Sequence, residues 1–248
     1  MIDIHSHIIP GVDDGSEDLD MSIEMAYLAL ESGIGTIIAT PHCDAVNGDG
    51  VQNAAQMRSA VSSFRRELRE REIPLEIYTG MEIFGTRSTA EYLDDGEYTT
   101  LADSRYPLIE FYFADYGVQA TRILASVVEA GYTPIVAHPE RYQYVCDEPQ
   151  LLNLWTDMGC LLQVNRGSFF GRFGEQTQAL AHGMLERGFV SFIASDAHSS
   201  EMRTPWLKDV ADFLELEYSD DYAETILETN PMSVIRNRII TMDEPEWF

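Results

Sequence analysis

The stretch Asp3-Ile4-His5-Ser6-His7 stands near the start of this 248-residue chain, and the rest of the sequence can be interpreted outward from it. Side chains alternate along a β-strand, so His5 and His7 are predicted to lie on the same face of an extended segment. Neutral imidazole is the commonest metal ligand in proteins, so the pair could bind a metal, although a surface strand that exposes two histidines would show the same pattern. The carboxylates of Asp13 and Asp14 follow in DIHSHIIPGVDDGS and strengthen that interpretation.

The chain is strongly acidic, with 42 Asp and Glu against 16 Lys and Arg and a formal net charge of −26. Such a surface repels phosphate backbones, which argues against a nucleic acid partner. Three cysteines are too sparse a set for a disulfide framework. No run is long enough to span a membrane, and the first predicted strand leaves no room for a signal peptide. We therefore expect a cytoplasmic protein without membrane insertion, and the oligomeric state stays open.

Apolar, β-branched segments alternate with helical patterns along the whole chain. The predicted strands are Met1–His5, Thr36–Thr40, Leu75–Glu82, Tyr106–Phe113, Thr133–Ala137, Cys160–Val164 and Phe189–Ala194. Strands separated by helices predict an α/β protein with a parallel sheet, either doubly wound or closed into a barrel. Because we find no internal repeat, low-complexity block or linker, a single domain over residues 1–248 is the simplest organisation.

Residues of metal-ligand type stand at or near the carboxyl ends of these predicted strands: His5, His7, His42, Glu82, Glu110, His138, Asp196 and His198. In a closed barrel the strand ends converge on one mouth, where active sites are built, so this placement favours the barrel. The remaining histidine, His182, falls within a predicted helix, and we interpret it as a packing or surface residue. Mixed imidazole and carboxylate ligation suits Mn²⁺, Fe²⁺ or Zn²⁺, and so many ligands can hold more than one ion.

Several motifs together resemble the PHP (polymerase and histidinol phosphatase) superfamily: DIHSHIIPGVDDGS, the TPH that contains His42, GMEI, LIEF, IVAHPERY and ASDAH. The likeness is closest to its CpsB-type branch, the bacterial metal-dependent protein-tyrosine phosphatases of capsule and exopolysaccharide loci. It extends from Met1 to about Pro231. The resemblance implies a distorted seven-stranded (β/α) barrel with up to three divalent ions, usually manganese.

The resemblance also implies which residues form the site. The ligand sets would be His5, His7, Glu82 and Asp196 for one ion, Glu82, Glu110 and His138 for a second, and Asp14, His42 and His198 for a third. Arg141 and Arg203 correspond to the family's phosphate-binding arginines. The implied reaction is hydrolysis of protein phosphotyrosine by a metal-bound hydroxide, while metals and arginines offset the charge on phosphate. The implied partner is a phosphotyrosine protein, such as the tyrosine-rich tail of a cognate bacterial tyrosine kinase.

Other interpretations stay open. Cys160 and Arg166 have the C-x5-R spacing of thiolate tyrosine phosphatases, although the residues between them are mostly apolar and strand-like. Amidohydrolases share the His-x-His pair, but their dinuclear members commonly use a central lysine, and the sole lysine here is Lys208. A small-molecule phosphatase of the histidinol phosphatase type would use similar ligands. A non-catalytic PHP binding domain would have no need of every ligand type.

The Gly-rich segment RGSFFGRFG follows the sixth predicted strand and contains Phe169, Phe170 and Phe173. Loops at the strand ends of a barrel line its mouth. We therefore expect these rings to lie at the mouth, where they would help to receive an aryl phosphate.

Overall fold

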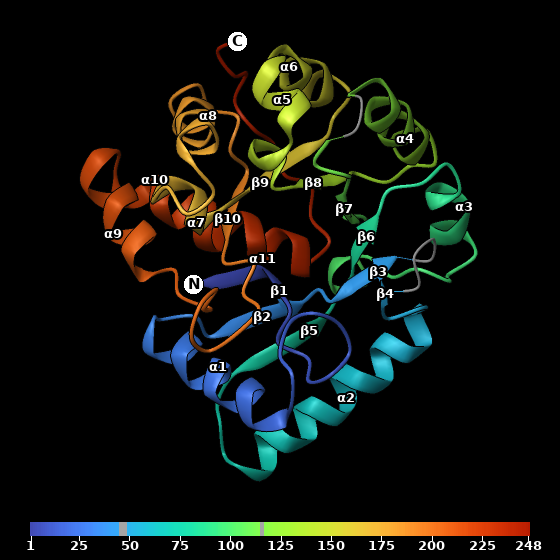
Figure 1. The fold of residues 1–248 in the computed structure, drawn as a ribbon, viewed down its shortest axis with the longest axis vertical. Helices are drawn as coiled ribbons and strands as arrows, with labels where there is room; N and C mark the ends of the chain where they lie inside the picture. Colours follow the sequence, from blue (N-terminus) through green and yellow to red (C-terminus); the bar gives the residue numbers. More distant parts are fainter. Residues whose placement is uncertain (45–48, 115–116) are drawn as a thin grey trace.

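Mostly parallel strands flanked by helices make up the protein, as a computed structural model shows for residues 1–44, 49–114 and 117–248 (Figure 1). Asp44 and Asp49 are described by their backbone alone. The strands are β1 Ile2–Ser6, β2 Thr36–Ala39, β3 His42–Asp44, β4 Asp49–Gly50, β5 Glu76–Thr79, β6 Glu82–Phe84, β7 Leu108–Glu110, β8 Ile135–Ala137, β9 Leu161–Asn165 and β10 Phe192–Ala194.

Helices connect most of these strands. The α-helices are α1 Leu19–Glu31, α2 Ala54–Glu70, α3 Thr89–Asp94, α4 Gly117–Glu129, α5 Gln143–Asp147, α6 Gln150–Asp157, α7 Arg166–Phe169, α8 Glu175–Glu186, α9 Lys208–Glu217, α10 Asp220–Glu224 and α11 Asn230–Ile235. Short turns of other helix types are η1 Leu101–Asp103, η2 Pro139–Arg141 and η3 Thr225–Thr229. In the part of the chain that is described, no helix combines the length and apolar character needed to cross a membrane.

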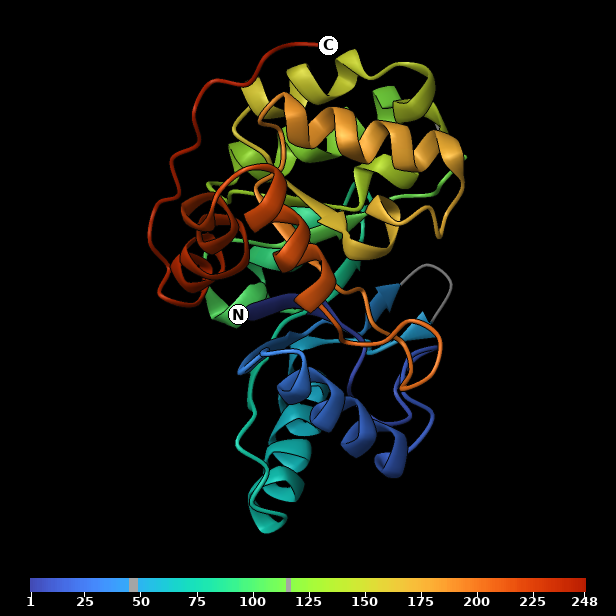
Figure 2. The same ribbon diagram turned by 90° about the vertical axis from the view of Figure 1, so that its left-hand side faces the viewer.

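The strands are arranged in two sheets. A three-stranded parallel sheet has the order β1-β2-β5, and a seven-stranded sheet has the order β10-β9-β8-β7-β6-β3-β4. In the larger sheet β3 and β4 pair antiparallel, and the other neighbours are parallel. Helices α1 and α2 cover the smaller sheet, whereas α4, α5, α6 and α8 lie over the larger one (Figures 1 and 2). The α/β class with parallel strands is therefore confirmed.

One predicted strand is divided into two, and another is followed by a strand, β3, that the sequence did not predict. The strand predicted over Thr36–Thr40 is β2, which pairs in the smaller sheet, and the chain then enters the larger sheet as β3. Pro41 separates β2 from β3 because it has no N–H to continue a ladder. The strand predicted over Leu75–Glu82 is divided between β5 and β6 at Gly80, where a Cβ would lie 2.9 Å from Ile38 Cγ2. The break places His42 opposite Glu82 in the β3–β6 pair.

The first and last strands meet and join the two sheets. Ser6 forms an isolated parallel bridge with Ala197. The N–H of His7 donates to the Ala197 carbonyl at 2.8 Å, and that of Asp196 donates to the His5 carbonyl at 2.9 Å. These bonds bring the two ends of the sequence together at one place.

Apolar residues alternate between two clusters along the strands. Leu108, Ile135 and Phe192 belong to an inner cluster that also contains Ile4 and Ile38. Their strand neighbours Ile109, Val136 and Ile193 pack in the larger cluster with the helices. Both faces of these strands are buried, which explains why the sequence shows continuous apolar runs rather than alternation.

Asp3 fastens β1 to the segment after β10. Its buried carboxylate accepts the Ser195 N–H at 3.1 Å and the Ser195 hydroxyl. Asp3→Ala should lower the free energy of unfolding by about 2 kcal/mol, because the Ser195 N–H would be left buried without an acceptor. Urea denaturation would measure this, with Asp18→Ala, which removes the exposed side-chain cap of α1, as the comparison. An Asp3→Ala variant as stable as the wild type would contradict the assignment.

Candidate metal centre

The histidine pair of the first strand lies on one side of the chain. The Nε2 atoms of His5 and His7 are 3.3 Å apart, and both side chains are buried. The turn that carries Asp13 and Asp14 passes directly over His7. A Cβ at Gly15 would lie 2.3 Å from the His7 Cβ, so the close approach of this turn requires glycine.

Glu82, the first residue of β6, lies in the middle of the histidines. Its Oε2 is 3.2 Å from His5 Nε2, 3.1 Å from His7 Nε2 and 3.1 Å from His42 Nδ1. Its Oε1 is 2.8 Å from His138 Nε2. Within the described ranges, Glu82 Oε2 and His138 Nδ1 are buried without a hydrogen-bond partner. A carboxylate surrounded by ring nitrogens in this way fits a bridging ligand between divalent cations.

The other eight side chains that the sequence singled out as metal ligands gather with Glu82 in one cluster. Ligand atoms within 4.8 Å of one another form four overlapping groups: His7, Asp14, His42 and His198; His5, His7 and Asp196; His5, Glu82 and His138; and His42, Glu82 and Glu110. The groups overlap more than the three predicted sets do. His7 joins the Asp14 group, and His42 lies beside Glu110, with Nδ1 2.8 Å from Oε1.

Asp196 connects the cluster to Arg141 and Arg203, the two arginines expected to bind phosphate. Its Oδ1 lies 3.4 Å from His5 Nε2. Its Oδ2 accepts a hydrogen bond from Arg141 Nη1 at 3.1 Å and is paired with the Arg203 guanidinium. The Nε–H of Arg203 also donates to the Asp196 carbonyl at 3.1 Å. Arg141 and Arg203 therefore come to the same carboxylate, and both side chains stay partly exposed.

Two residues of the cluster have a backbone that side chains other than glycine rarely adopt. His138 has φ 34° and Asp196 has φ 50°. Left-handed backbone at such residues costs on the order of 1–3 kcal/mol and is concentrated at functional sites. The surrounding fold holds both side chains in this unfavourable conformation, which supports a functional role for the cluster.

Three further side chains hold the cluster in place. Asp13 was expected near the histidine pair, whereas the contacts of Gln163 and Asn165 were not predicted from the sequence. His7 Nδ1 is 2.7 Å from Asp13 Oδ2, His5 Nδ1 is 2.8 Å from Gln163 Oε1, and Asn165 Nδ2 donates to Asp196 Oδ2 at 2.6 Å. Partners of this kind orient metal-binding imidazoles. A signal was present for two of them, since Gln163 and Asn165 alternate in the otherwise apolar strand β9, where buried polar groups need partners.

The crowding of imidazoles and carboxylates moves their pKa values apart. Burial by itself would lower the pKa of His42, but the charges of Glu82 and Glu110 outweigh it and raise this pKa to about 9. Burial lowers the pKa of His138 to about 4, despite its hydrogen bond to Glu82. Burial and the neighbouring Glu82 raise the pKa of Glu110 to about 7. His138 is thus neutral at physiological pH, which is the form that binds metals.

The expectation for the phenylalanine segment is partly wrong. Phe169 is the last residue of α7 and is buried, with its ring 5.4 Å from His182 and 6.2 Å from Phe213. It cannot line a mouth, because α7 turns its side chain into the core. Phe170 is half-exposed near Arg166, and Phe173 lies 4.3 Å from the Arg141 guanidinium carbon.

Cys160 and Arg166 do not form a thiolate site. Cys160 directly precedes β9 and Arg166 directly follows it, and six residue steps of extended chain span about 20 Å. Burial raises the pKa of the Cys160 thiol to about 12, and Arg166 is paired with Asp209.

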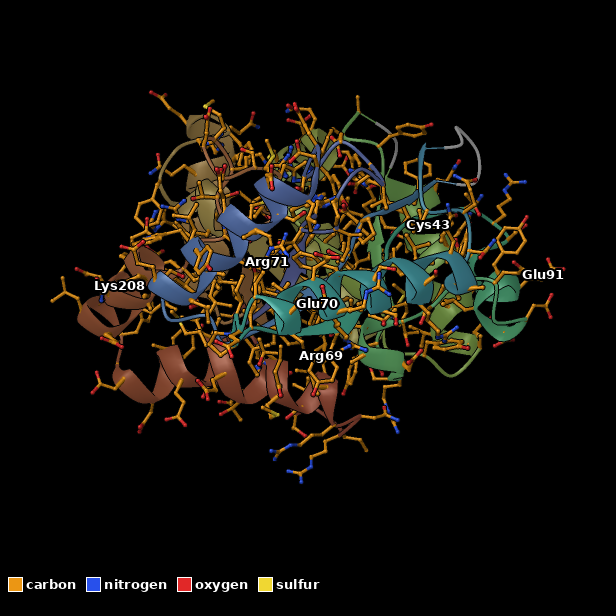
Figure 3. All side chains as sticks on the ribbon, turned by 90° about the horizontal axis from the view of Figure 1, so that it is seen from below. Cys43, Arg69, Glu70, Arg71, Glu91 and Lys208 are labelled. Atoms are coloured by element: carbon orange, nitrogen blue, oxygen red, sulfur yellow. The ribbon has the colours of Figure 1, made fainter. Side chains whose placement is uncertain are left out.

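Lys208 is not placed for an amidohydrolase lysine. It begins α9 at the edge of the molecule (Figure 3), where its Nζ lies 3.2 Å from Asp212. The interpretation of His182 as a packing residue is confirmed, since its Nε2 lies 3.1 Å from the Phe169 carbonyl and its ring 5.6 Å from that of Phe213.

A family model described as capsular polysaccharide synthesis, CpsB/CapC, matches residues 1–236. The chain belongs to the CpsB/CapC family. Relatives of this CpsB/CapC protein include tyrosine-protein phosphatase YwqE of Bacillus subtilis (strain 168), which is 35% identical over 246 residues that cover 99% of this chain and 96% of YwqE. Tyrosine-protein phosphatase CpsB of Streptococcus pneumoniae is 32% identical over 247 residues, covering 97% of this chain and 100% of CpsB.

Solved structures agree with the family. A crystal structure from work on YwqE and CpsB, described there as unique metal-dependent tyrosine phosphatases, matches with a TM-score of 0.93 and 33% identity, covering 100% of this chain and 99% of that chain. A β-aspartyl dipeptidase from Fervidobacterium islandicum shares the fold alone, with a TM-score of 0.57 and 15% identity over 97% of this chain and 74% of that chain. The family matches and the structural match therefore confirm the resemblance to the CpsB-type branch that the sequence motifs indicated.

The different positions of the two neighbouring phenylalanines can be tested by truncation. Phe169→Ala should lower the free energy of unfolding by about 3–5 kcal/mol, because it leaves a cavity in the core. Phe170→Ala removes a half-exposed ring and should change stability by less than about 1 kcal/mol. Thermal or urea unfolding of the pair would decide, and equal effects of the two substitutions would contradict the burial of Phe169.

Proposed function

We propose that this CpsB/CapC protein is a metal-dependent phosphomonoesterase that hydrolyses protein phosphotyrosine in the regulation of capsule or exopolysaccharide synthesis. The observation that carries the proposal is the buried Glu82 Oε2, 3.1–3.2 Å from the ring nitrogens of three histidines and without a hydrogen-bond partner among the described residues. Similarity over the full length of YwqE and CpsB, which are named tyrosine-protein phosphatases, supports the choice of substrate.

The side chains present fit a centre of up to three divalent cations. Five imidazoles and four carboxylates make up the cluster, and its carboxylates outnumber the two arginines beside it, so bound cations would offset the excess negative charge. We propose Mn²⁺ as the metal, with Fe²⁺ or Zn²⁺ as alternatives. Divalent cations bound there would supply Lewis-acid charge and activate water for attack on phosphorus.

Arg141 and Arg203 are proposed to bind the phosphoryl oxygens. The Arg141 guanidinium carbon lies over the rings of both Phe113 and Phe173, at 4.6 and 4.3 Å from their centroids. This stacking fixes the plane of the guanidinium, which suits bidentate recognition of a phosphate. Phe113 is also half-exposed and offers an aryl surface beside the cluster. A tyrosinate leaving group, with a phenol pKa near ~10, has little need of a strong general acid.

The proposed organisation is a single domain over residues 1–248, in which the two sheets act as one distorted seven-stranded barrel. The bonds between β1 and the segment after β10 support closure, as does the inner apolar cluster shared by strands of both sheets. The consecutive strands β2 and β3 would together count as one strand of such a barrel, and so would β5 and β6.

The proposed partner is a phosphotyrosine protein in the cytoplasm, and the tyrosine-rich tail of a cognate bacterial kinase is the candidate that the family suggests. The net charge of −26 argues against nucleic acid.

The proposed function can be tested with a phosphotyrosine peptide and histidinol phosphate assayed side by side. Each assay would use the protein as purified, after chelation and after addition of Mn²⁺. We expect peptide turnover that disappears with chelator and returns with manganese. Turnover confined to histidinol phosphate would move the protein to small-molecule chemistry, and activity that survives complete removal of metal would overturn the proposal.

Glu82→Gln should reduce both metal content and turnover. The substitution keeps the shape of the side chain but removes the charge that faces the histidines, so we expect metal affinity to fall about 10–100-fold. Elemental analysis of the dialysed protein gives a measurement that is independent of activity. The matched control is Glu91→Gln, an exposed glutamate on α3 (Figure 3). Unchanged metal content in Glu82→Gln would contradict the bridging role.

A further inference from the structure

A groove of about 550 Å³ lies between the loop after β6 and one face of α4. The residues that line it are Arg87, Val118, Gln119, Arg122, Ile123 and Ser126. Helix α4 forms one wall of the groove and lies beside α3, which follows the loop that contains Arg87 (Figure 1). None of the residues that line the groove is a member of the metal cluster.

The two arginines of the groove are exposed. Across residues 1–44, 49–114 and 117–248, neither Arg87 nor Arg122 has an ion-pair or hydrogen-bond partner. The arginines at the metal cluster, by contrast, are paired with Asp196. In a chain with a net charge of −26, two such guanidinium groups facing one groove form a local site for an anion.

The groove is close to the metal cluster. Arg87 follows Glu82 by five residues, so an extended chain could separate their Cα atoms by at most about 18 Å. The ring of Phe84, at the end of β6, lies 4.4 Å from the half-exposed ring of Tyr112. Phe113, the next residue, stacks on Arg141. Aromatic side chains therefore stand on both segments that lead from the cluster to the groove, β6 before Arg87 and the residues before α4.

We propose that this groove binds acidic side chains of the substrate polypeptide, within about five residues of the phosphotyrosine. The inference rests on the proposed phosphotyrosine hydrolase function and adds a recognition site to it. Guanidinium groups pair with carboxylates through two parallel hydrogen bonds, and Val118 and Ile123 offer apolar contact for the peptide between them. Val118 and Gln119 in the first turn of α4 also line the groove, and the N–H groups of that turn favour an anion. The groove is also larger than a single small anion requires.

Direct binding tests the groove without using activity. A fluorescent, unphosphorylated peptide with several Asp and Glu residues would be titrated with wild type and with Arg87→Gln/Arg122→Gln. The control is Arg66→Gln/Arg69→Gln, which removes the same charge from exposed positions on α2, where Arg69 is visible in Figure 3. We expect the groove variant to weaken binding about five- to tenfold and the control variant to leave it unchanged. An equal loss of peptide affinity in both variants would show that only the net charge of the protein matters, and it would overturn the proposal.

Kinetics then locate the groove relative to the reaction. Three substrates would be compared: a phosphotyrosine peptide with acidic residues three to five positions away, the same peptide with these residues more than ten positions away, and a small aryl phosphate. The groove variant should raise KM about five- to tenfold for the first substrate alone, with kcat unchanged. A uniform change over all three substrates, or none, would overturn the proposal. If the wild type turns over none of them, the proposed function fails, and the binding assay still decides on the groove.

Discussion

The contact of Glu82 with four histidines is the interaction on which the rest of the site depends. A buried carboxylate with an unsatisfied oxygen is costly unless a cation or proton compensates it. The histidines reach it from β1, from β3 and from the residue after β8, so strands far apart in the sequence must end at one point. The topology of both sheets meets this requirement.

Two breaks in the strands make that convergence possible. Pro41 and Gly80 let the chain leave the smaller sheet and enter the larger one, and His42 and Glu82 stand directly after these breaks as partners in register. The backbone of His138 and Asp196 is left-handed for a similar reason, because the side chains must turn back into the cluster where their strands end. The unfavourable backbone of these two residues lowers stability locally, but it places their side chains in the cluster.

Charge is distributed unevenly around this centre. The chain as a whole is strongly acidic, yet Arg141 and Arg203 converge on Asp196 beside the cluster. Two further arginines, Arg87 and Arg122, are exposed and line the groove next to α4. An anionic substrate would therefore meet local positive charge on an otherwise repulsive surface, which favours orientation over general attraction. The aromatic rings of Phe113 and Phe173 hold one of these arginines in place.

The sequence by itself determined the α/β class, the parallel strands and the eight ligand-type residues at strand ends, because apolar runs and the residues that follow them are local features. Asp14, Arg141 and Arg203 were indicated by the family resemblance. The histidine pair, Glu82 and the two arginines are all recognisable from the motifs in which they stand. Only the tertiary structure showed that the chain changes sheets between β2 and β3 and between β5 and β6, that Phe169 points into the core, and that Gln163 and Asn165 hold ligands in position. Those facts depend on which residues from distant segments meet, and neither periodicity nor spacing records such contacts.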